Sequence, residues 1–344
     1  MKIEQDLKLD FSDVLIRPKR STLESRNDIN LEREFKFPHS KQLWNGIPII
    51  ASNMDTVGTV EMYNTLNNYN MLTCFHKFLN IDEYPENINN NYMISIGIRD
   101  EDYNKLEQLY KISPDKCNII CIDIANGYIK KLVDFCLKVR NLIPNCILIA
   151  GSVVSREMVE ELIINAKVDI VRVGIGSGSV CTTRLQTGCG MPQLSAVIEC
   201  ADAAHGCGGF IISDGGITCP GDASKAFGAG ADFVMIGSMF AGHTESGGEL
   251  IEEDNKKYKI FYGMSSDTAM NKHYGGVSKY RSSEGKTVKL QYRGDVSNTV
   301  DDLLGGIRST CTYVNSKNLK DLSKCTTFMR VNNQVNNIYG KTNQ

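Results

Sequence analysis

Eight short apolar runs, each followed by a helical pattern, constrain the fold of this 344-residue chain more than any other feature. The runs are nearly continuous in apolar residues, as strands are when both faces of a parallel sheet are covered. They span 47–52, 71–75, 92–96, 118–123, 146–150, 169–173, 210–213 and 233–236, with helical patterns such as 128–140, 157–165 and 194–205 between them. Eight such alternations predict an α/β protein, a single (β/α)8 TIM barrel over 1–344, with an open doubly wound sheet as the structural alternative.

Glycine or polar residues follow every apolar run. They include Asn53 after the first run, Lys77 after the second, and the pair Gly237-Ser238 after the eighth. In a (β/α)8 barrel these strand ends meet at one face, and that face holds the active site. One such cluster indicates only a turn, whereas eight on the same side predict a binding face.

Charge and apolar content exclude several classes of partner. The formal net charge is -2, so we expect neither nucleic acid nor an anionic membrane as a partner. No run approaches the roughly 18 apolar residues of a membrane span, and residues 1–6 lack an apolar signal core, which predicts a cytoplasmic protein. The 12 cysteines are irregularly spaced and form no CxxC pair, so eleven are interpreted as structural thiols and Cys181 as the exception.

The composition changes after the eighth apolar run. Glycine, serine and charged residues dominate from about 242 to 294, which is far longer than the typical connection of roughly 4–6 residues. Long loops in compact domains usually have a function, so this segment is predicted to be an active-site flap. The polar tail from about 331 to 344 is expected to be poorly ordered.

A glycine-rich loop follows the sixth run and carries a candidate nucleophile. Its sequence is Gly-Ile-Gly-Ser-Gly-Ser-Val-Cys-Thr-Thr-Arg over 174–184. The alternating glycines permit positive φ and close approach of a ligand. Exposed among backbone N–H groups, Cys181 would act as a thiolate nucleophile. The alternative is a glycine loop with an unreactive cysteine.

Four further segments and Lys77 suggest phosphate and proton chemistry. The glycines of 214–216 and the pair 237–238 follow runs seven and eight, where barrels often bind phosphate, and Asp214 is assigned to ribose hydroxyls because it would repel phosphate. Tight turns are the alternative there. Residues 262–266 and 280–286 of the flap offer a carboxylate and cations, or form only a solvated loop. Lys77 can hold an anionic cofactor or face water.

Together these stretches resemble the IMP dehydrogenase/GMP reductase family, from 9–20 to 305–313, most specifically over 174–184, 212–216, 228–237 and 262–266. Three features favour the reductase branch. Residues 77–92 leave no room for the CBS insertion of the dehydrogenases, the segments 241–249 and 280–285 look like the reductase, and the flap shows no Arg-Tyr pair for activating water. An IMP dehydrogenase without its CBS domain is the alternative. Ser177 stands where the family usually has proline, which is expected to loosen the loop.

The resemblance implies a reaction and a set of reacting groups. GMP and NADPH are converted irreversibly into IMP, ammonia and NADP in purine interconversion and salvage, through a covalent thioimidate on Cys181. Thr183 and Glu284 are expected to supply the proton that the departing amine needs. The resemblance also implies a homotetramer. A catalytically silent nucleotide-binding or scaffold protein and a flavin barrel are the rivals from other classes.

The same resemblance assigns the binding residues. GMP is expected at Asp214, Gly215, Gly216, Gly237, Ser238, Gly263, Met264, Ser265, Arg281, Ser282, Ser283, Glu284 and Gly285. NADPH is expected at Ser25, Arg26, Lys77, Asp123, Ile124, Ala125, Ile175, Gly176, Met264, Tyr280, Arg281, Ser309, Thr310, Cys311 and Thr312, some of them across a subunit boundary. A potassium ion is expected on carbonyls of Gly176, Gly178 and Cys181.

Overall fold

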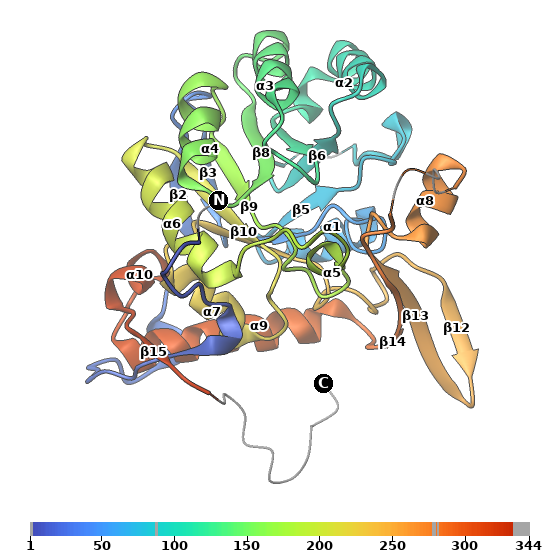
Figure 1. The fold of residues 1–344 in the computed structure, drawn as a ribbon. Coiled ribbons are helices and arrows are strands. Elements are labelled where there is room, and N and C mark those ends of the chain that lie inside the picture. The colour runs from blue at the N-terminus through green and yellow to red at the C-terminus, as the bar shows by residue number, and fades with distance from the viewer. Residues whose placement is uncertain (1–2, 87–88, 277–279, 281, 333–344) are drawn as a thin grey trace.

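Eight parallel strands form a closed barrel in the computed structural model, which describes residues 3–86, 89–276, 280 and 282–332. Each strand pairs with its neighbours along the chain, and the last strand pairs with the first (Figure 1). The strands are β4 (Ile49–Ala51), β5 (Leu72–Phe75), β6 (Tyr92–Ile96), β7 (Ile119–Asp123), β8 (Ile147–Val153), β9 (Ile170–Val173), β10 (Phe210–Asp214) and β11 (Phe233–Ile236). The predicted barrel is confirmed, and all eight predicted strands belong to it.

Helices cover the outside of the barrel, as α2, α3, α4 and α6 do in Figure 1. The helix α3 shows why they pack there, because its buried residues Leu132, Phe135, Cys136 and Val139 share one face at helical spacing. The helices are α1 (Val60–Asn67), α2 (Asp100–Ile112), α3 (Lys130–Leu142), α4 (Arg156–Glu160) with the π-helical turn η5 (Glu161–Asn165), α5 (Thr183–Thr187), α6 (Gln193–Gly206), α7 (Pro220–Gly228), α9 (Val296–Val314) and α10 (Leu322–Cys325). The three helical patterns named from the sequence are therefore confirmed, with ends shifted by a few residues.

Aromatic side chains close the end of the barrel where the strands begin. The antiparallel pair β2 (Arg33–Lys36) and β3 (Leu43–Gly46) supplies Phe35 and Trp44, which are buried with Phe37 against the barrel interior. Phe35 stacks on Phe233 of β11 with ring centroids 4.4 Å apart. This closed end leaves the opposite end, at the carboxyl termini of the strands, as the open one.

The segment from 242 to 294 lies after the last barrel strand, as predicted, but it has more regular structure than a loop. It contains β12 (Leu250–Glu253), β13 (Lys256–Tyr262) and β14 (Thr287–Gln291), which form an antiparallel sheet, and the helix α8 (Asp267–Tyr274). Figure 1 shows the hairpin of β12 and β13 projecting away from the barrel, whereas α8 lies closer to the barrel. We call residues 242–294 the flap.

The two ends of the described chain meet on one side of the barrel. Strand β1 (Val14–Ile16) pairs antiparallel with β15 (Phe328–Arg330), and the Val331 N–H donates to the Asp13 carbonyl at 3.0 Å. The described chain continues to residue 332, and residues 333–344 of the predicted tail lie outside the described residues. Short 3₁₀ turns complete the chain at η1 (Phe11–Asp13), η2 (Arg26–Asp28), η3 (Ile81–Glu83), η4 (Pro114–Lys116) and η6 (Leu319–Asp321).

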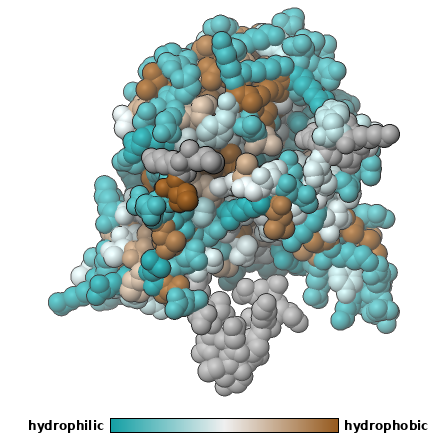
Figure 2. Space-filling model, in the orientation of Figure 1, coloured by the Kyte–Doolittle hydropathy of each residue, from teal (hydrophilic) through white to brown (hydrophobic). Residues whose placement is uncertain are grey.

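Burial agrees with most of the cysteine interpretation. All twelve cysteines are free thiols, and seven of them are buried. Cys189 is exposed and therefore departs from the structural default. Hydrophilic residues cover most of the face in Figure 2, and the hydrophobic ones lie in separate groups. Within the described ranges, no helix is both long and apolar enough to cross a bilayer.

Candidate active site

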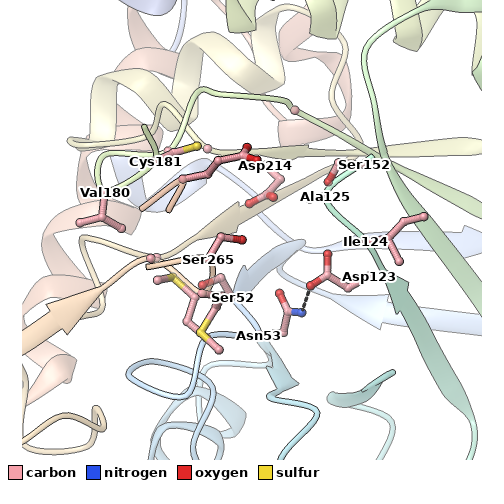
Figure 3. A pocket seen from close by; sticks show the side chains of 18 of the residues that line it. Ser52, Asn53, Asp123, Ile124, Ala125, Ser152, Val180, Cys181, Asp214 and Ser265 are labelled. Atoms are coloured by element: carbon pink, nitrogen blue, oxygen red, sulfur yellow. Dashed lines mark hydrogen bonds between the residues drawn. The ribbon is translucent and has the colours of Figure 1, made fainter. Parts of the chain in front are cut away.

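A cavity of about 690 Å³ opens at the carboxyl ends of the barrel strands. Residues in or just after the carboxyl ends of all eight strands line it, and the flap adds residues from β13, α8 and the segment before β14. Figure 3 shows Val180 and Cys181 on one side of this cavity and Asp123 and Ile124 on the other. Its position and size are those of a barrel enzyme's substrate pocket.

Most of the predicted site residues line this one cavity. Of the reacting groups, Cys181, Thr183 and Glu284 all do. The predicted substrate set contributes Asp214, Gly215, Gly216, Gly237, Ser238, Gly263, Met264 and Ser265. The predicted cofactor and ion sets contribute Lys77, Asp123, Ile124, Ala125, Ile175, Gly176 and Gly178. Residues far apart in the chain are thus brought together as the strand-end argument expects.

The cysteine loop depends on its glycines. Gly174 has φ +151°, and a Cβ there would lie 2.1 Å from the Asp214 carbonyl oxygen. Gly176 has φ +78°, and a Cβ there would lie 2.7 Å from Cγ of Arg184. Both positions therefore require glycine for conformation and for space. The close contact of Gly174 with Asp214 holds the start of the loop against β10. Cys181, farther along the loop, is partly exposed at the cavity wall.

A series of hydrogen bonds joins the cysteine to the flap. Cys181 Sγ donates to Thr183 Oγ1 at 3.2 Å, and Thr183 Oγ1 donates to Glu284 Oε2 at 2.7 Å. Backbone bonds hold these parts in register, because the Thr182 N–H donates to the Glu284 carbonyl at 2.9 Å. Both donors point toward the carboxylate, so a proton can pass between the thiol and Glu284 through the hydroxyl.

Arg172 organises the floor of the cavity. This buried side chain of β9 lies 2.5 Å from Asp123 and 2.8 Å from Asp214, and Asn53 donates to the other oxygen of Asp123 at 2.8 Å. Burial opposes the guanidinium charge, but the two carboxylates raise its pKa overall. Burial also raises the pKa of Asp214, and Arg172 offsets that only in part. The cation thereby fixes two carboxylates that face the cavity.

Ser177 ties the cysteine loop to the end of β10. Its hydroxyl donates to the Asp214 carbonyl at 3.0 Å, a bond that proline cannot make. The sequence comparison with the family led us to expect a looser loop at this position. The hydrogen bond opposes that loosening, because it connects the loop to a buried barrel strand.

Several predicted residues lie elsewhere. Ser25, Arg26 and the α9 residues Ser309, Thr310, Cys311 and Thr312 do not line the cavity, and η2 packs against α9 instead. Tyr280 is 92% exposed and also lies outside the cavity lining. Ser282, Ser283 and Gly285 do not line the cavity either. Gly285 bridges to Cys181, and Ser283 Oγ donates to the Ser265 carbonyl at 3.4 Å. Arg281 lies outside the described residues.

The structure also adds residues that the sequence analysis did not assign. Arg172 had a usable signal, since a cation inside a buried apolar run needs a partner. Phe78, Arg99, His273 and Tyr274 line the part of the cavity that we call its outer half. Lys77 and Arg99 both lie over the Tyr274 ring, at 5.7 and 5.3 Å. Their proximity depends on the folding of the flap onto the barrel, which leaves no local sequence pattern.

Across the part of the chain that the structure describes, no three His, Cys, Asp or Glu residues are placed to hold a metal ion. Backbone carbonyls remain as possible oxygen ligands for a monovalent cation. The carbonyl of Gly178 accepts the Cys181 N–H at 3.1 Å and keeps a second lone pair.

A closed barrel with a cysteine loop after its sixth strand and a flap after its eighth defines a class of barrel enzymes, and the family comparison agrees. The model of the IMP dehydrogenase / GMP reductase domain matches residues 8–337, so the chain belongs to that family. It is 58% identical to proteins named GMP reductase from Salmonella typhi and from Salmonella newport (strain SL254). Each match covers 98% of this chain and 99% of the relative.

Proposed function

We propose that this chain is a GMP reductase that converts GMP and NADPH into IMP, ammonia and NADP. The observation that carries the proposal is the hydrogen-bond series from Cys181 through Thr183 to Glu284 at the wall of a nucleotide-sized cavity. The 58% identity to relatives named GMP reductase supports the same reaction. The proposed unit is one catalytic barrel that works as a homotetramer in purine salvage.

Cys181 is the proposed nucleophile. Its thiol proton passes through Thr183 to Glu284, and the thiolate adds to C2 of the guanine ring. The bond from C2 to the exocyclic nitrogen then breaks, and Glu284 returns the proton through Thr183 so that ammonia leaves instead of an amide anion. The product is a thioimidate on Cys181, which divides one difficult displacement into two easier steps.

The floor and rim of the cavity hold the substrate. Asp214, fixed by Arg172, accepts hydrogen bonds from the ribose hydroxyls. The backbone N–H groups of Gly215, Gly216, Gly237 and Ser238 are offered to the phosphate, as loops after strands seven and eight are in other barrels. Gly263–Ser265 close over the base. The buried Ser52 hydroxyl also lines the cavity and has no hydrogen-bond partner within the described residues. It is therefore free to bind the substrate.

The outer half of the cavity fits a nicotinamide cofactor. A bound NADPH would supply the hydride for C2. The Cys181 thiolate would then leave with the electrons of the C–S bond and take up a proton from water, which restores the thiol. Lys77 contributes a cation there, the aromatic rings of Phe78 and Tyr274 offer stacking surfaces, and Asp123–Ala125 form the opposite wall. The carbonyls of Gly176, Gly178 and Cys181 would hold a potassium ion, which would steady the loop that carries the thiol.

Two paired assays test the proposal. The protein is incubated with GMP plus NADPH, and separately with IMP plus NAD, while the nicotinamide absorbance is followed. We expect turnover only in the first mixture, and turnover only in the second would identify a dehydrogenase. Turnover in neither mixture, with no protection of Cys181 from thiol labelling by GMP, would point to a catalytically silent protein.

The covalent step has its own test. The Cys181→Ala variant should keep its fold by circular dichroism and lose GMP reduction. Mass spectrometry of quenched wild-type turnover should show a purine adduct on the peptide that contains Cys181. Normal turnover by the variant would refute the covalent route.

A further inference from the structure

A buried carboxylate outside the proposed chemistry connects the barrel to the flap. Asp55 follows β4, and only 2% of its side chain is exposed. Its Oδ2 accepts three hydrogen bonds, from Tyr262 Oη at 2.6 Å, Lys272 Nζ at 3.0 Å and His273 Nε2 at 2.6 Å. All three donors belong to the flap, at the end of β13 and in the last turn of α8. We call these four residues the Asp55 anchor.

The packing around the anchor is close. The ring of His273 stacks on Phe78, with centroids 3.6 Å apart and planes 3° apart. A Cβ on Gly247 of the flap would lie 2.2 Å from the Asp55 carbonyl oxygen, so the flap approaches this turn in two places. Burial raises the pKa of Asp55, but the hydrogen bonds from Tyr262, His273 and Lys272 lower it overall. The anchor is therefore a charged acceptor held by converging donors.

The other end of α8 reaches the candidate substrate site. Ser266 caps the helix by accepting from the Ala269 N–H at 3.2 Å, and its own N–H donates to the Gly263 carbonyl at 2.9 Å. The Ser265 carbonyl accepts the Glu284 N–H at 3.1 Å. One short helix thus runs from the Asp55 anchor to Gly263–Ser265, and His273 and Tyr274 at its far end line the outer half of the cavity.

We propose that Asp55 is a positioning residue, which holds α8 against the barrel and so places Gly263–Ser265 over the substrate. Asp55 itself does not line the cavity, so it acts through the helix. Charge-assisted hydrogen bonds are the strong ones, and a group with three of them is costly to replace. Loss of the anchor frees one end of α8, whereas Glu284 stays held by its separate backbone bond to Thr182. Substrate binding should therefore suffer more than the chemical step.

The first test needs no activity. Amide hydrogen exchange is measured over 264–274 in the nucleotide-free protein for wild type and for Asp55→Asn. The amide keeps the shape of the side chain but removes its charge. We expect exchange about tenfold faster in the variant, equivalent to ~1.4 kcal/mol of lost docking free energy. Unchanged exchange would overturn the anchor, whatever the reaction is.

The second test rests on the proposed function and measures its kinetics. For Asp55→Asn the KM for GMP should rise about tenfold, while kcat falls less than ~3-fold, because only binding elements are released. Faster exchange with an unchanged KM would show a structural contact without a positioning role and would overturn the proposal. Absence of GMP turnover in the wild type would count against the proposed function alone, since the exchange measurement would still decide the anchor.

Control variants separate the anchor from general weakening of the flap. Lys289→Met breaks the exposed Lys289–Glu253 ion pair of the flap sheet and should leave exchange and KM as in wild type. Should Asp55→Asn fail to fold, Lys272→Met replaces it, because Lys272 is 53% exposed and tolerates substitution. A smaller rise of about threefold in exchange rate and in KM is expected there. Wild-type values for Lys272→Met and for His273→Asn together would also overturn the proposal.

Discussion

Replacing Arg172 by methionine would test the floor of the cavity most directly. Arg172 lies 2.5 Å from Asp123 and 2.8 Å from Asp214, and its own side chain is 10% exposed. Methionine fills a similar volume but provides no charge. The variant therefore leaves two neighbouring carboxylates without their shared counter-ion, in a place where water reaches them only from the cavity.

The expected loss of stability follows from that burial. Removing one partner of a buried ion pair typically costs about 3–5 kcal/mol. Asp123 and Asp214 are 27% and 19% exposed, so cavity water solvates them in part and the lower end applies. We expect the free energy of unfolding to fall by about 3 kcal/mol near neutral pH. The KM for GMP should rise by at least about tenfold, because Asp214 loses the cation that orients it.

The pH dependence gives an independent check on the same reasoning. Burial already raises the pKa of Asp214, with Arg172 opposing that rise. Without Arg172 the pKa rises further, so the folded variant binds a proton more readily than the unfolded chain does. A group with a raised pKa in the folded state loses stability as pH increases through that pKa. The stability gap between variant and wild type should therefore narrow as pH falls from neutral toward mildly acidic values.

The assay is urea unfolding at several pH values together with steady-state kinetics. Arg140→Met is the matched control, because Arg140 forms a buried ion pair with Asp169 at 2.8 Å away from the cavity. It should lose stability on the same scale and keep the wild-type KM for GMP. Wild-type stability of Arg172→Met, or an equal rise in KM for Arg140→Met, would refute the reasoning.

Three further outcomes are expected. Glu284→Gln should slow ammonia release, measured by rapid quench without cofactor, more than hydride transfer from a preformed adduct; equal slowing would argue against a proton role. Gly215→Ala should lower kcat/KM about tenfold, because φ is +90° and a Cβ there would lie 2.4 Å from Ser177 Oγ. The control Gly208→Ala, where φ is +74° and no atom lies within 4 Å of the added Cβ, should lose stability but keep kcat/KM. Phe35→Ala should cost about 3–5 kcal/mol in thermal or urea unfolding, with kcat/KM of the folded protein unchanged; a changed kcat/KM would show coupling between the two barrel ends.

The barrel and the inner half of the site were readable from the sequence. Parallel strands buried on both faces must be apolar throughout, so each of the eight runs carried its own signal. The residues that follow those runs, such as Asp214, Gly237 and the loop that carries Cys181, meet at one face because every parallel strand ends there. Local pattern and global position are linked by geometry in this part of the molecule.

The flap shows where local pattern is insufficient. Strand β14 alternates partly buried and exposed residues. It pairs directly with β13, although the helix α8 lies between the two strands in the sequence. Its short alternation within a segment rich in glycine, serine and charge predicts only a loop. The aromatic pair Phe35 and Trp44 was likewise not recognised as the closure of the barrel, because nothing in β2 and β3 specifies what their apolar side will cover.

The sequence determined the eight strands, the barrel and the face that carries the thiol, because those depend on runs of neighbouring residues. The tertiary structure alone decided which charged groups meet. Arg172 reaches Asp123 and Asp214, and Asp55 collects donors more than two hundred residues away at Tyr262 and His273. It also placed Ser25 and Arg26 beside α9 and away from the cavity. Such contacts depend on how separate elements pack in space, and packing distance is not encoded in local composition.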